Sequence, residues 1–425
     1  MNAPTPTNSA AAAVAEAMRR IYDAGLTTTS GGNISLRDAA DRLWITPAGI
    51  DKGSLTEALI SSVDVDGVVT GGPRPSSELP FHQRIHRVRP DVRAVVHAHP
   101  PGLVAFSLGR HAPDPRLLLG VAGHCGDVGF APYALTGSEA LGEVIAATFA
   151  QGYDAIVLEN HGVVVVGPTL EVAMRRFELV EHVAQVQLKA KALGPTTLPS
   201  QALLEGVRRS VEESRPEEYG AAPAGSELAD ELARFARRAA QHQLAPGSLG
   251  RFSARSSEGR FLLTAPDVSA SLMGPADVRA AVVADALSWD REAAAHAAVY
   301  REQPEVRAII STAPVHASAY CLTAAPLDTR TIPESYILLR EIHRLPAEAL
   351  LSSPDELAGR LSLQAPAALI DHVGALVVGR SPLEAFDRLE VLESTARSLI
   401  EAQALGPVSP ISKEAIEDLS RAFPA

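Results

Sequence analysis

The order of apolar and polar residues predicts alternating helices and strands in the first half of the chain. An amphipathic helix is predicted near residues 10–24, and further helices over 78–89 and 170–192. Between them lie short stretches rich in β-branched residues, which predict strands. These stretches are 33–37, 42–46, 94–97, 155–158 and 163–166. The alternation predicts a mixed α/β or α+β domain whose helices cover a central sheet.

The second half of the chain repeats the first. RPDVRAVVHAHPPGLVAFS at 89–107 and QPEVRAIISTAPVHASAYC at 303–321 align with an offset of 214 residues. GVVVVG at 162–167 and GALVVG at 374–379 align with an offset of 212. Matches in the same order at a nearly constant offset predict a tandem duplication.

The duplication divides 425 residues into two domains of ordinary size. We predict copy 1 at residues 1–215 and copy 2 at 225–425. The stretch between them is charged and then rich in Ala, Pro and Gly, which is typical of a linker.

Composition excludes several classes of protein. A formal charge of −12 argues against a nucleic-acid groove, which needs a basic surface. No apolar run reaches the ~18 residues that span a bilayer, and the amino-terminal stretch does not resemble a secretion signal. The two cysteines, Cys125 and Cys321, lie far apart and do not suggest a disulfide framework. We therefore expect a cytoplasmic protein without a nucleic-acid or membrane partner.

Three histidines of copy 1 are candidate metal ligands. In VVHAHP at 95–100, His97 and His99 are two residues apart on a predicted strand, so both imidazoles point to the same face. That pair alone is equally compatible with two structural histidines. His161 lies in LENHG, at a junction between two apolar strands from which it can reach a neighbouring strand. Three histidines with an open fourth position are typical of catalytic zinc, although Mn²⁺, Fe²⁺ or Co²⁺ could use similar ligands.

Glu78 lies in RPSSELPFH, where proline and two serines precede a predicted helix. A glutamate in the first turn of a helix interacts favourably with the helix dipole, so taken alone Glu78 is best explained as a helix-start residue. Its place in the following resemblance adds a second role.

Copy 1 resembles the class II aldolase/adducin family, whose best-known enzymes are fuculose-1-phosphate aldolase and ribulose-5-phosphate 4-epimerase. Five stretches carry the resemblance in the family's order: TSGGNIS at 29–35, ITPAGIDKGSL at 45–55, PSSELPFHQRIH at 75–86, VVHAHP at 95–100 and ENHGVVVVG at 159–167. The resemblance implies a three-layer α/β/α domain with a central mixed or antiparallel sheet, in two tandem copies.

The resemblance also implies a role for each matching residue. His97, His99 and His161 would bind zinc, and Glu78 would be the catalytic acid/base. Residues expected to line a pocket for a small anionic substrate are Ser30, Gly31, Asn33, Gly49, Ser76 and Ser77. Tyr133 occupies the place of the tyrosine with which fuculose-type aldolases protonate the aldehyde in a neighbouring subunit, which favours bond cleavage over epimerisation. A buried structural tyrosine is the alternative.

Copy 2 lacks the predicted metal ligands. It has Ser311, Ala313 and Val373 at the positions of the three histidines. His316 and His372 are nearby but out of register. SLGR at 248–251 replaces SGGN at 30–33, whereas Glu292 and His296 keep the positions of Glu78 and His82. We interpret copy 2 as a pseudo-enzyme domain.

These observations predict a divalent-metal-dependent lyase, an aldolase or decarboxylase that cleaves a C–C bond of a small hydroxy-carbonyl, sugar-phosphate or hydroxy-acid substrate through a metal-stabilised enolate. A metal-dependent epimerase or dehydratase and a non-catalytic adducin-like interaction protein are the alternatives. Because family members commonly form rings of four, the resemblance implies a homodimer that builds a pseudo-tetrameric ring from alternating copies.

Overall fold

The computed structural model forms two compact units. It describes residues 9–64, 66–212, 220–257, 259–286 and 290–424. Within these residues, the first unit ends at Pro115 and resumes over His124–Gln185. The second unit takes Arg116–Gly123 and the chain from Val186 onward. A short segment from the sequence of copy 1 is therefore part of the second unit.

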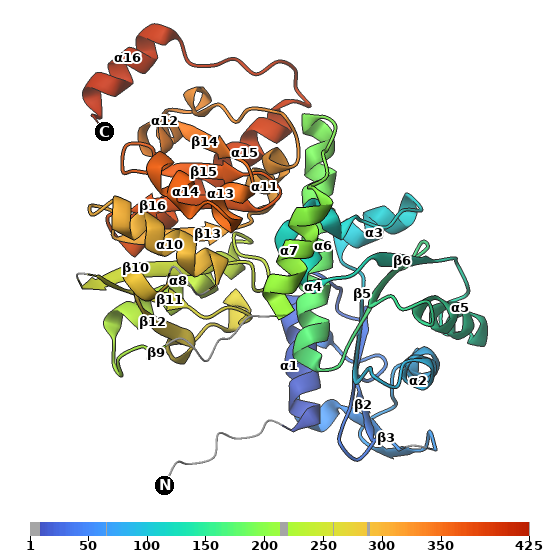
Figure 1. Cartoon of the computed structure of the whole chain (residues 1–425). Helices are drawn as coiled ribbons and strands as arrows, with labels where there is room; N and C mark the ends of the chain where they lie inside the picture. Colours follow the sequence, from blue (N-terminus) through green and yellow to red (C-terminus); the bar gives the residue numbers. More distant parts are fainter. Residues whose placement is uncertain (1–8, 65, 213–219, 258, 287–289, 425) are drawn as a thin grey trace. The chain divides into compact units, whose positions relative to one another are not determined.

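The first unit is built on an eight-stranded sheet in the order β4-β3-β2-β1-β5-β8-β7-β6, in which only β6 and β7 are parallel neighbours (Figure 1). Its strands are β1 (Asn33–Arg37), β2 (Leu43–Ile45), β3 (Ser61–Val63), β4 (Val69–Gly71), β5 (Ala94–Ala98), β6 (Val128–Ala131), β7 (Ala155–Leu158) and β8 (Gly162–Gly167). The central strands β5, β7 and β8 are buried along their whole length, as expected for strands covered on both faces.

Helices cover both faces of this sheet. They are α1 (Ala10–Asp23), α2 (Leu79–Val88), α3 (Pro101–Leu108), α5 (Glu139–Phe149) and the first part of α6 (Leu170–Leu193). The helices α2 and α5 share a core with alternate residues of the strands, which include Val95 and Val164, whereas α1 packs on β1 and β2. Figure 1 shows α2 and α5 on one side of the sheet and α1 on the other.

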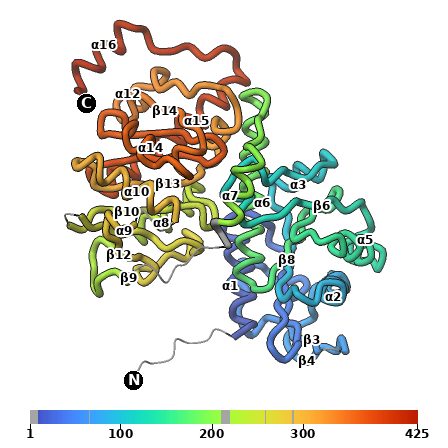
Figure 2. The backbone as a smooth tube through the Cα atoms, viewed as in Figure 1, coloured from blue at the N-terminus to red at the C-terminus, as the bar shows by residue number. Residues whose placement is uncertain are grey.

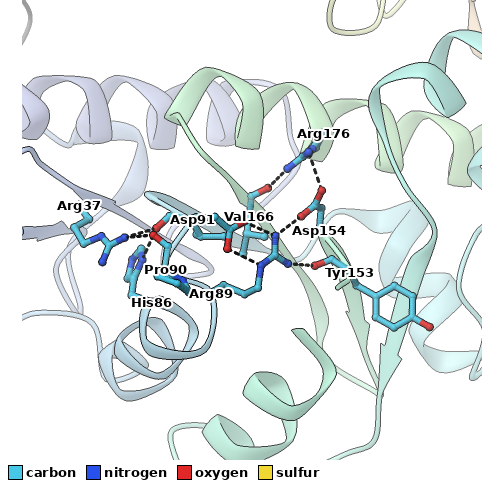
Figure 3. A network of polar contacts seen from close by, with 10 residues as sticks. Arg37, His86, Arg89, Pro90, Asp91, Tyr153, Asp154, Val166 and Arg176 are labelled. Carbon is cyan, nitrogen blue, oxygen red and sulfur yellow. Dashed lines mark hydrogen bonds and ion pairs between the residues drawn. The ribbon is translucent and has the colours of Figure 1, made fainter. Parts of the chain in front are cut away.

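A polar network ties three strands together at the end of the sheet remote from His97, His99 and His161 (Figure 3). Arg89 bonds to Asp91 just before β5 and to Asp154 just before β7, at 2.7 and 2.9 Å. Arg176 of α6 bonds to the same Asp154 at 2.8 Å and donates to the carbonyl oxygen of Val166 at the end of β8. Because these links fix the strands at one end, they restrain the positions of the side chains at the other.

The second unit repeats the sheet. Its order, β14-β15-β16-β13-β10-β11-β12-β9, places matching strands in matching positions when read from the far edge, with β9 in the place of β4. In Figure 2, β9 and β12 lie at one end of this unit and β14 lies at the other. Its strands are β9 (Gly220–Ala221), β10 (Arg251–Ser257), β11 (Arg260–Thr264), β12 (Val278–Val282), β13 (Ala308–Thr312), β14 (Ile342–Leu345), β15 (Ala367–Ile370) and β16 (Gly374–Gly379). Its helices include α4 (Leu119–His124), α7 (Gln201–Glu212), α8 (Glu227–Gln241), α10 (Arg291–Glu302), α11 (Val315–Cys321), α12 (Pro333–Leu339), α13 (Glu348–Leu351), α14 (Pro354–Arg360), α15 (Pro382–Ala402) and α16 (Lys413–Ala422).

The fold class predicted from the sequence is confirmed. Two mixed sheets of eight strands, each flanked by helices, follow one another in the chain. The helices and strands predicted in the first half are all present, with bounds that differ by at most two residues. Among the described residues, no helix combines the length and the apolar character needed to cross a membrane.

Candidate metal centre

The imidazoles of His97, His99 and His161 converge. Each offers a ring nitrogen, and these three atoms all lie within 4.8 Å of one another. The ring centroids are 4.8 to 5.1 Å apart. His97 is fully buried, whereas His99 and His161 are partly exposed. Among the described residues, this is the one group of potential metal ligands.

Strand pairing explains why these residues meet. His97 lies at the end of β5, paired with Asn33 of β1 on one side and Val164 of β8 on the other. His161 lies in the turn between β7 and β8, where Asn160 has a positive φ of 54°. Since β8 is the direct neighbour of β5, that turn is placed beside the end of β5.

Two glycines make room for His99. A Cβ atom on Gly162 would lie 2.7 Å from the Cδ2 of His99, and one on Gly31 would lie 2.9 Å from its Nδ1. Both distances are shorter than a Cβ atom can adopt, so any residue with a side chain at Gly31 or Gly162 would clash with the His99 ring. Gly31, predicted to line the substrate pocket, therefore also allows the imidazole to take its place.

The tautomer of His97 is fixed by the backbone. Its Nδ1–H donates to the carbonyl oxygen of Val163 at 2.9 Å. Burial, followed by the neighbouring His99 and His161, holds the pKa of His97 well below its usual value. The ring is therefore neutral, and its Nε2 presents a lone pair toward His99 Nε2 at 3.1 Å. A backbone acceptor on the second nitrogen is the usual partner of a metal-binding histidine.

Glu78, the N-cap residue of α2, approaches the same point. Its Oε2 is 3.3 Å from His97 Nε2, and its Oε1 is 3.7 Å from His161 Nε2. Oε1 is buried without a hydrogen-bond partner. A buried carboxylate oxygen and the lone pairs of neutral imidazoles repel one another and lack hydrogen-bond donors. This arrangement is therefore unfavourable unless a cation binds between them. The donor set thus fits a divalent cation.

The predicted substrate residues lie on three loops that are tied to one another. Ser76 N–H donates to the carbonyl oxygen of Thr46, and Ala48 N–H donates to that of Arg74. Ser76 is buried and accepts the backbone N–H of Glu78. The remaining predicted residues Ser30, Gly49 and Ser77 are exposed. Asn33 is buried, and its side-chain amide nitrogen donates a hydrogen bond to Glu78 Oε2.

Lys52 is a member of the same loop cluster to which the sequence did not assign a role. Its side chain is 2% exposed, and its Nζ donates to the carbonyl oxygen of Pro47 at 2.8 Å. Its backbone N–H donates to Thr29. Burial lowers its pKa. A buried lysine is costly, and the signal that could have found it is its place between two glycines in AGIDKG.

Tyr133 follows β6 and is 59% exposed. Its backbone N–H donates to Glu159, two residues before His161, at 2.9 Å. The structure thus does not bury this side chain, and it gives no contact between Tyr133 and the histidines of the same chain. Its catalytic role stays a prediction.

Copy 2 has a guanidinium at the position of Asn33. Arg251 lies opposite Ser311, as Asn33 lies opposite His97. Its side chain is 3% exposed and donates to Asp290 at 2.9 Å, with Glu292 at 3.8 Å. A fixed positive charge therefore faces the glutamate that corresponds to Glu78.

Apolar packing occupies another former ligand position. Val373, at the place of His161, packs against a cluster that includes Leu119, Ala122 and Leu204. His372 beside it bonds through Nδ1 to the carbonyl oxygen of Leu117 at 3.1 Å, and its own carbonyl oxygen accepts the N–H of Leu119. The segment Arg116–Gly123 thus packs against Val373, the residue of copy 2 that corresponds to the predicted metal ligand His161 of copy 1.

The chain belongs to the family described as Class II Aldolase and Adducin N-terminal domain, whose model matches residues 12–188 and again 230–400. A 5-methylthioribulose-1-phosphate/5-deoxyribulose-1-phosphate aldolase of Rhodospirillum rubrum is 35% identical over 187 residues, which are 44% of this chain and 83% of the relative. The L-fuculose phosphate aldolase of Escherichia coli K12 is 36% identical over 170 residues, 40% of this chain and 78% of the relative. A solved L-fuculose 1-phosphate aldolase shares 27% identity at a TM-score of 0.45, covering 50% of this chain and all of that one. The family and the tandem arrangement predicted from the sequence are confirmed.

Proposed function

We propose that copy 1 is a zinc-dependent aldolase that cleaves a C–C bond in a small phosphorylated hydroxy-carbonyl compound. The observation that carries the proposal is the convergence of His97, His99 and His161 with Glu78 at one buried point. Neutral histidines favour Zn²⁺, with Mn²⁺, Fe²⁺ or Co²⁺ as substitutes. The relatives named above are aldolases of sugar phosphates, which supports this substrate class.

A divalent cation held by the three imidazoles would supply stabilisation of the negative charge that develops on substrate oxygens during bond cleavage. The chain's own residues do the rest. Glu78 Oε2 is held by Asn33 at 2.7 Å, whereas its Oε1 lacks a partner. We assign to Oε1 the transfer of the proton, because the held oxygen fixes the carboxylate while the other remains available.

Ser30, Gly49 and Ser77 are exposed residues on loops of small residues, and the family resemblance implies that they line the substrate pocket. Backbone N–H groups on such loops bind phosphate or carboxylate without a large side-chain charge. We propose that they hold the anionic end of the substrate. Tyr133 matches the proton donor of fuculose-type aldolases, but in a ring of alternating copies it would face the site of copy 2. The corresponding stretch of copy 2, around Glu348–Ser353, has no tyrosine. In that arrangement another residue would donate the proton at the site of copy 1.

Three variants test the proposal. Purified wild type is expected to contain zinc and to release an aldehyde and dihydroxyacetone phosphate from L-fuculose 1-phosphate or 5-deoxyribulose 1-phosphate. His97→Ala and His99→Ala are each expected to lose both metal and activity. Glu78→Gln is expected to keep the metal and lose the activity. Retention of metal and activity in both histidine variants would refute the proposal, and an epimerised product without aldehyde would replace it with an epimerase.

A further inference from the structure

Behind Glu78, four side chains form one hydrogen-bonded row. Glu78 and His82 are four residues apart at the start of α2, so they share one face of the helix. Asn33 and Ser35 are two residues apart on β1, so they share one face of the strand. The helix face lies against the strand face, and the side chains alternate between them. All four residues are buried.

The distances in the row are those of hydrogen bonds. Asn33 Nδ2 lies 2.7 Å from Glu78 Oε2. Asn33 Oδ1 lies 2.5 Å from His82 Nε2. His82 Nδ1 lies 2.7 Å from Ser35 Oγ. The row is continuous from Ser35 to Glu78 Oε2, and only Glu78 Oε1 lies outside it.

The position of every proton in the row follows from this order. An ionised Glu78 only accepts hydrogen bonds, so the amide nitrogen of Asn33 faces it and the amide oxygen faces His82. His82 Nε2 must then carry the proton that is donated to Asn33. Burial, with His86 and His97 nearby, holds the pKa of His82 well below its usual value, so the ring is neutral. Its Nδ1 therefore accepts the hydroxyl proton of Ser35.

We propose that His82 is a positioning residue that acts through Asn33 to hold the Glu78 carboxylate at the three imidazoles. Asn33 could rotate its amide by half a turn at little steric cost. The donor on His82 Nε2 removes that freedom, because the reversed amide would set two N–H donors against each other. The proposal rests on the function proposed above, since it takes Glu78 as the acid/base.

A comparison with copy 2 shows which contacts of the row occur in both domains and which occur only in copy 1. Ser253 Oγ and His296 Nδ1 are 2.8 Å apart, as Ser35 and His82 are in copy 1. His296 Nε2, however, lies 3.1 Å from Ser311 Oγ, and Arg251 replaces the asparagine. The serine–histidine pair occurs in both copies, but its link to the glutamate occurs only beside the three imidazoles.

The test compares His82→Phe with His82→Gln in the full-length zinc-loaded protein. The phenyl ring removes the donor, whereas the glutamine amide can restore it. His82→Phe is expected to lower kcat on the order of 10- to 100-fold, because a displaced catalytic group has such effects. KM and the zinc bound per chain are expected to stay within about twofold, and His82→Gln is expected to recover most of the rate.

Two further arms decide the outcome. His296→Phe removes the matching ring in copy 2 and is expected to leave kcat unchanged. The double variant Asn33→Ala/His82→Phe is expected to be no slower than Asn33→Ala alone, because both act through the same carboxylate. A loss in His82→Phe no larger than in His296→Phe, or fully additive losses in the double variant, would overturn the proposal.

A spectroscopic arm keeps the inference separate from the proposed function. In protein labelled with ¹⁵N-histidine and loaded with zinc alone, His82 is expected to show the Nε2–H tautomer, and Asn33→Ala is expected to shift that nitrogen signal. If wild type cleaves neither sugar phosphate, the proposed function fails while this arm still tests the row. A His82 signal of the Nδ1–H tautomer, or one unmoved by Asn33→Ala, refutes the row itself.

Discussion

The Nδ1–H of His97 donates to the carbonyl oxygen of Val163 across 2.9 Å, from one central strand to its neighbour. A β-sheet register normally sets only which side chains share a face. Here it also sets which nitrogen of an imidazole carries the proton, because the acceptor is part of the adjoining backbone. The lone pair of Nε2 is therefore directed at the site before any cation binds.

We predict one zinc ion per chain, although the chain holds two copies of the domain. Copy 2 has Ser311, Ala313 and Val373 at the ligand positions, so it offers no nitrogen donors there. Elemental analysis of purified protein after dialysis measures the ratio. Ser311→Ala is the matched control and is expected to leave the ratio at one, whereas His161→Ala should weaken zinc binding more than ~100-fold, the upper range for loss of a mere supporting contact. A ratio of two would contradict the assignment.

Asp154→Ala is expected to destabilise the first unit by on the order of 1–3 kcal/mol, because two arginines, Arg89 and Arg176, lose a shared partner with limited solvent access. Asp91→Ala removes a mostly exposed partner of Arg89 and is expected to cost less than ~1 kcal/mol. Urea titration of both variants checks the order. Equal losses would show that Asp154 contributes no more than Asp91 to the stability of the network in Figure 3.

Acid should destabilise the protein partly through His182. Burial lowers the pKa of this histidine to about 3, whereas in the unfolded chain it titrates near its ordinary value. The unfolded state therefore binds more protons below about pH 6.5, and stability falls by about 1.4 kcal/mol per pH unit from there until about pH 3. His182→Met should lessen the slope of unfolding free energy against pH. The same substitution at the exposed His111 is the control and should leave the slope as in wild type.

Neither cysteine should react in the native protein. Cys125 and Cys321 are free and buried, and burial raises the pKa of each thiol to about 12. Alkylation with iodoacetamide at pH 8 needs the thiolate and access to it. Mass spectrometry is expected to find no adduct without denaturant and two adducts in denaturant. Rapid labelling of the native chain would show that these sites open.

Much of the fold could be predicted from the sequence because its signals are local or repeated. The β-branched runs around His97 and His161 predict their strands, and the constant offset predicts the second domain. The short strands β3 (SSV), β4 (VTG) and β6 (VGFA) could not be predicted, because serine or glycine interrupts each of them, whereas the equally short β2 (LWI) and β7 (AIVL) are apolar throughout. Their place depends on pairing with neighbours that are distant in the sequence.

Part of the candidate site could likewise be predicted from local sequence, and part depends on how distant segments pack. The spacing of His97 and His99 predicts a shared face, and the family motif supplies His161 and Glu78. The sequence predicts a substrate-lining role for Asn33, but its amide is engaged by Glu78 and His82 on both sides. That engagement depends on how α2 faces β1. The two glycines around Lys52 in AGIDKG mark a turn, but the burial of its side chain depends on how three loops meet.

The segment Arg116–Gly123 is encoded within copy 1 and folds with the second unit. A cut at the linker would consequently remove Ala347, Leu351 and Val373 from the apolar cluster that covers Leu119 and Ala122. The boundary between the two sequence copies is thus not the boundary between the two folded units. The carboxyl-terminal copy therefore supplies packing for part of the amino-terminal copy, a role that does not depend on binding a metal.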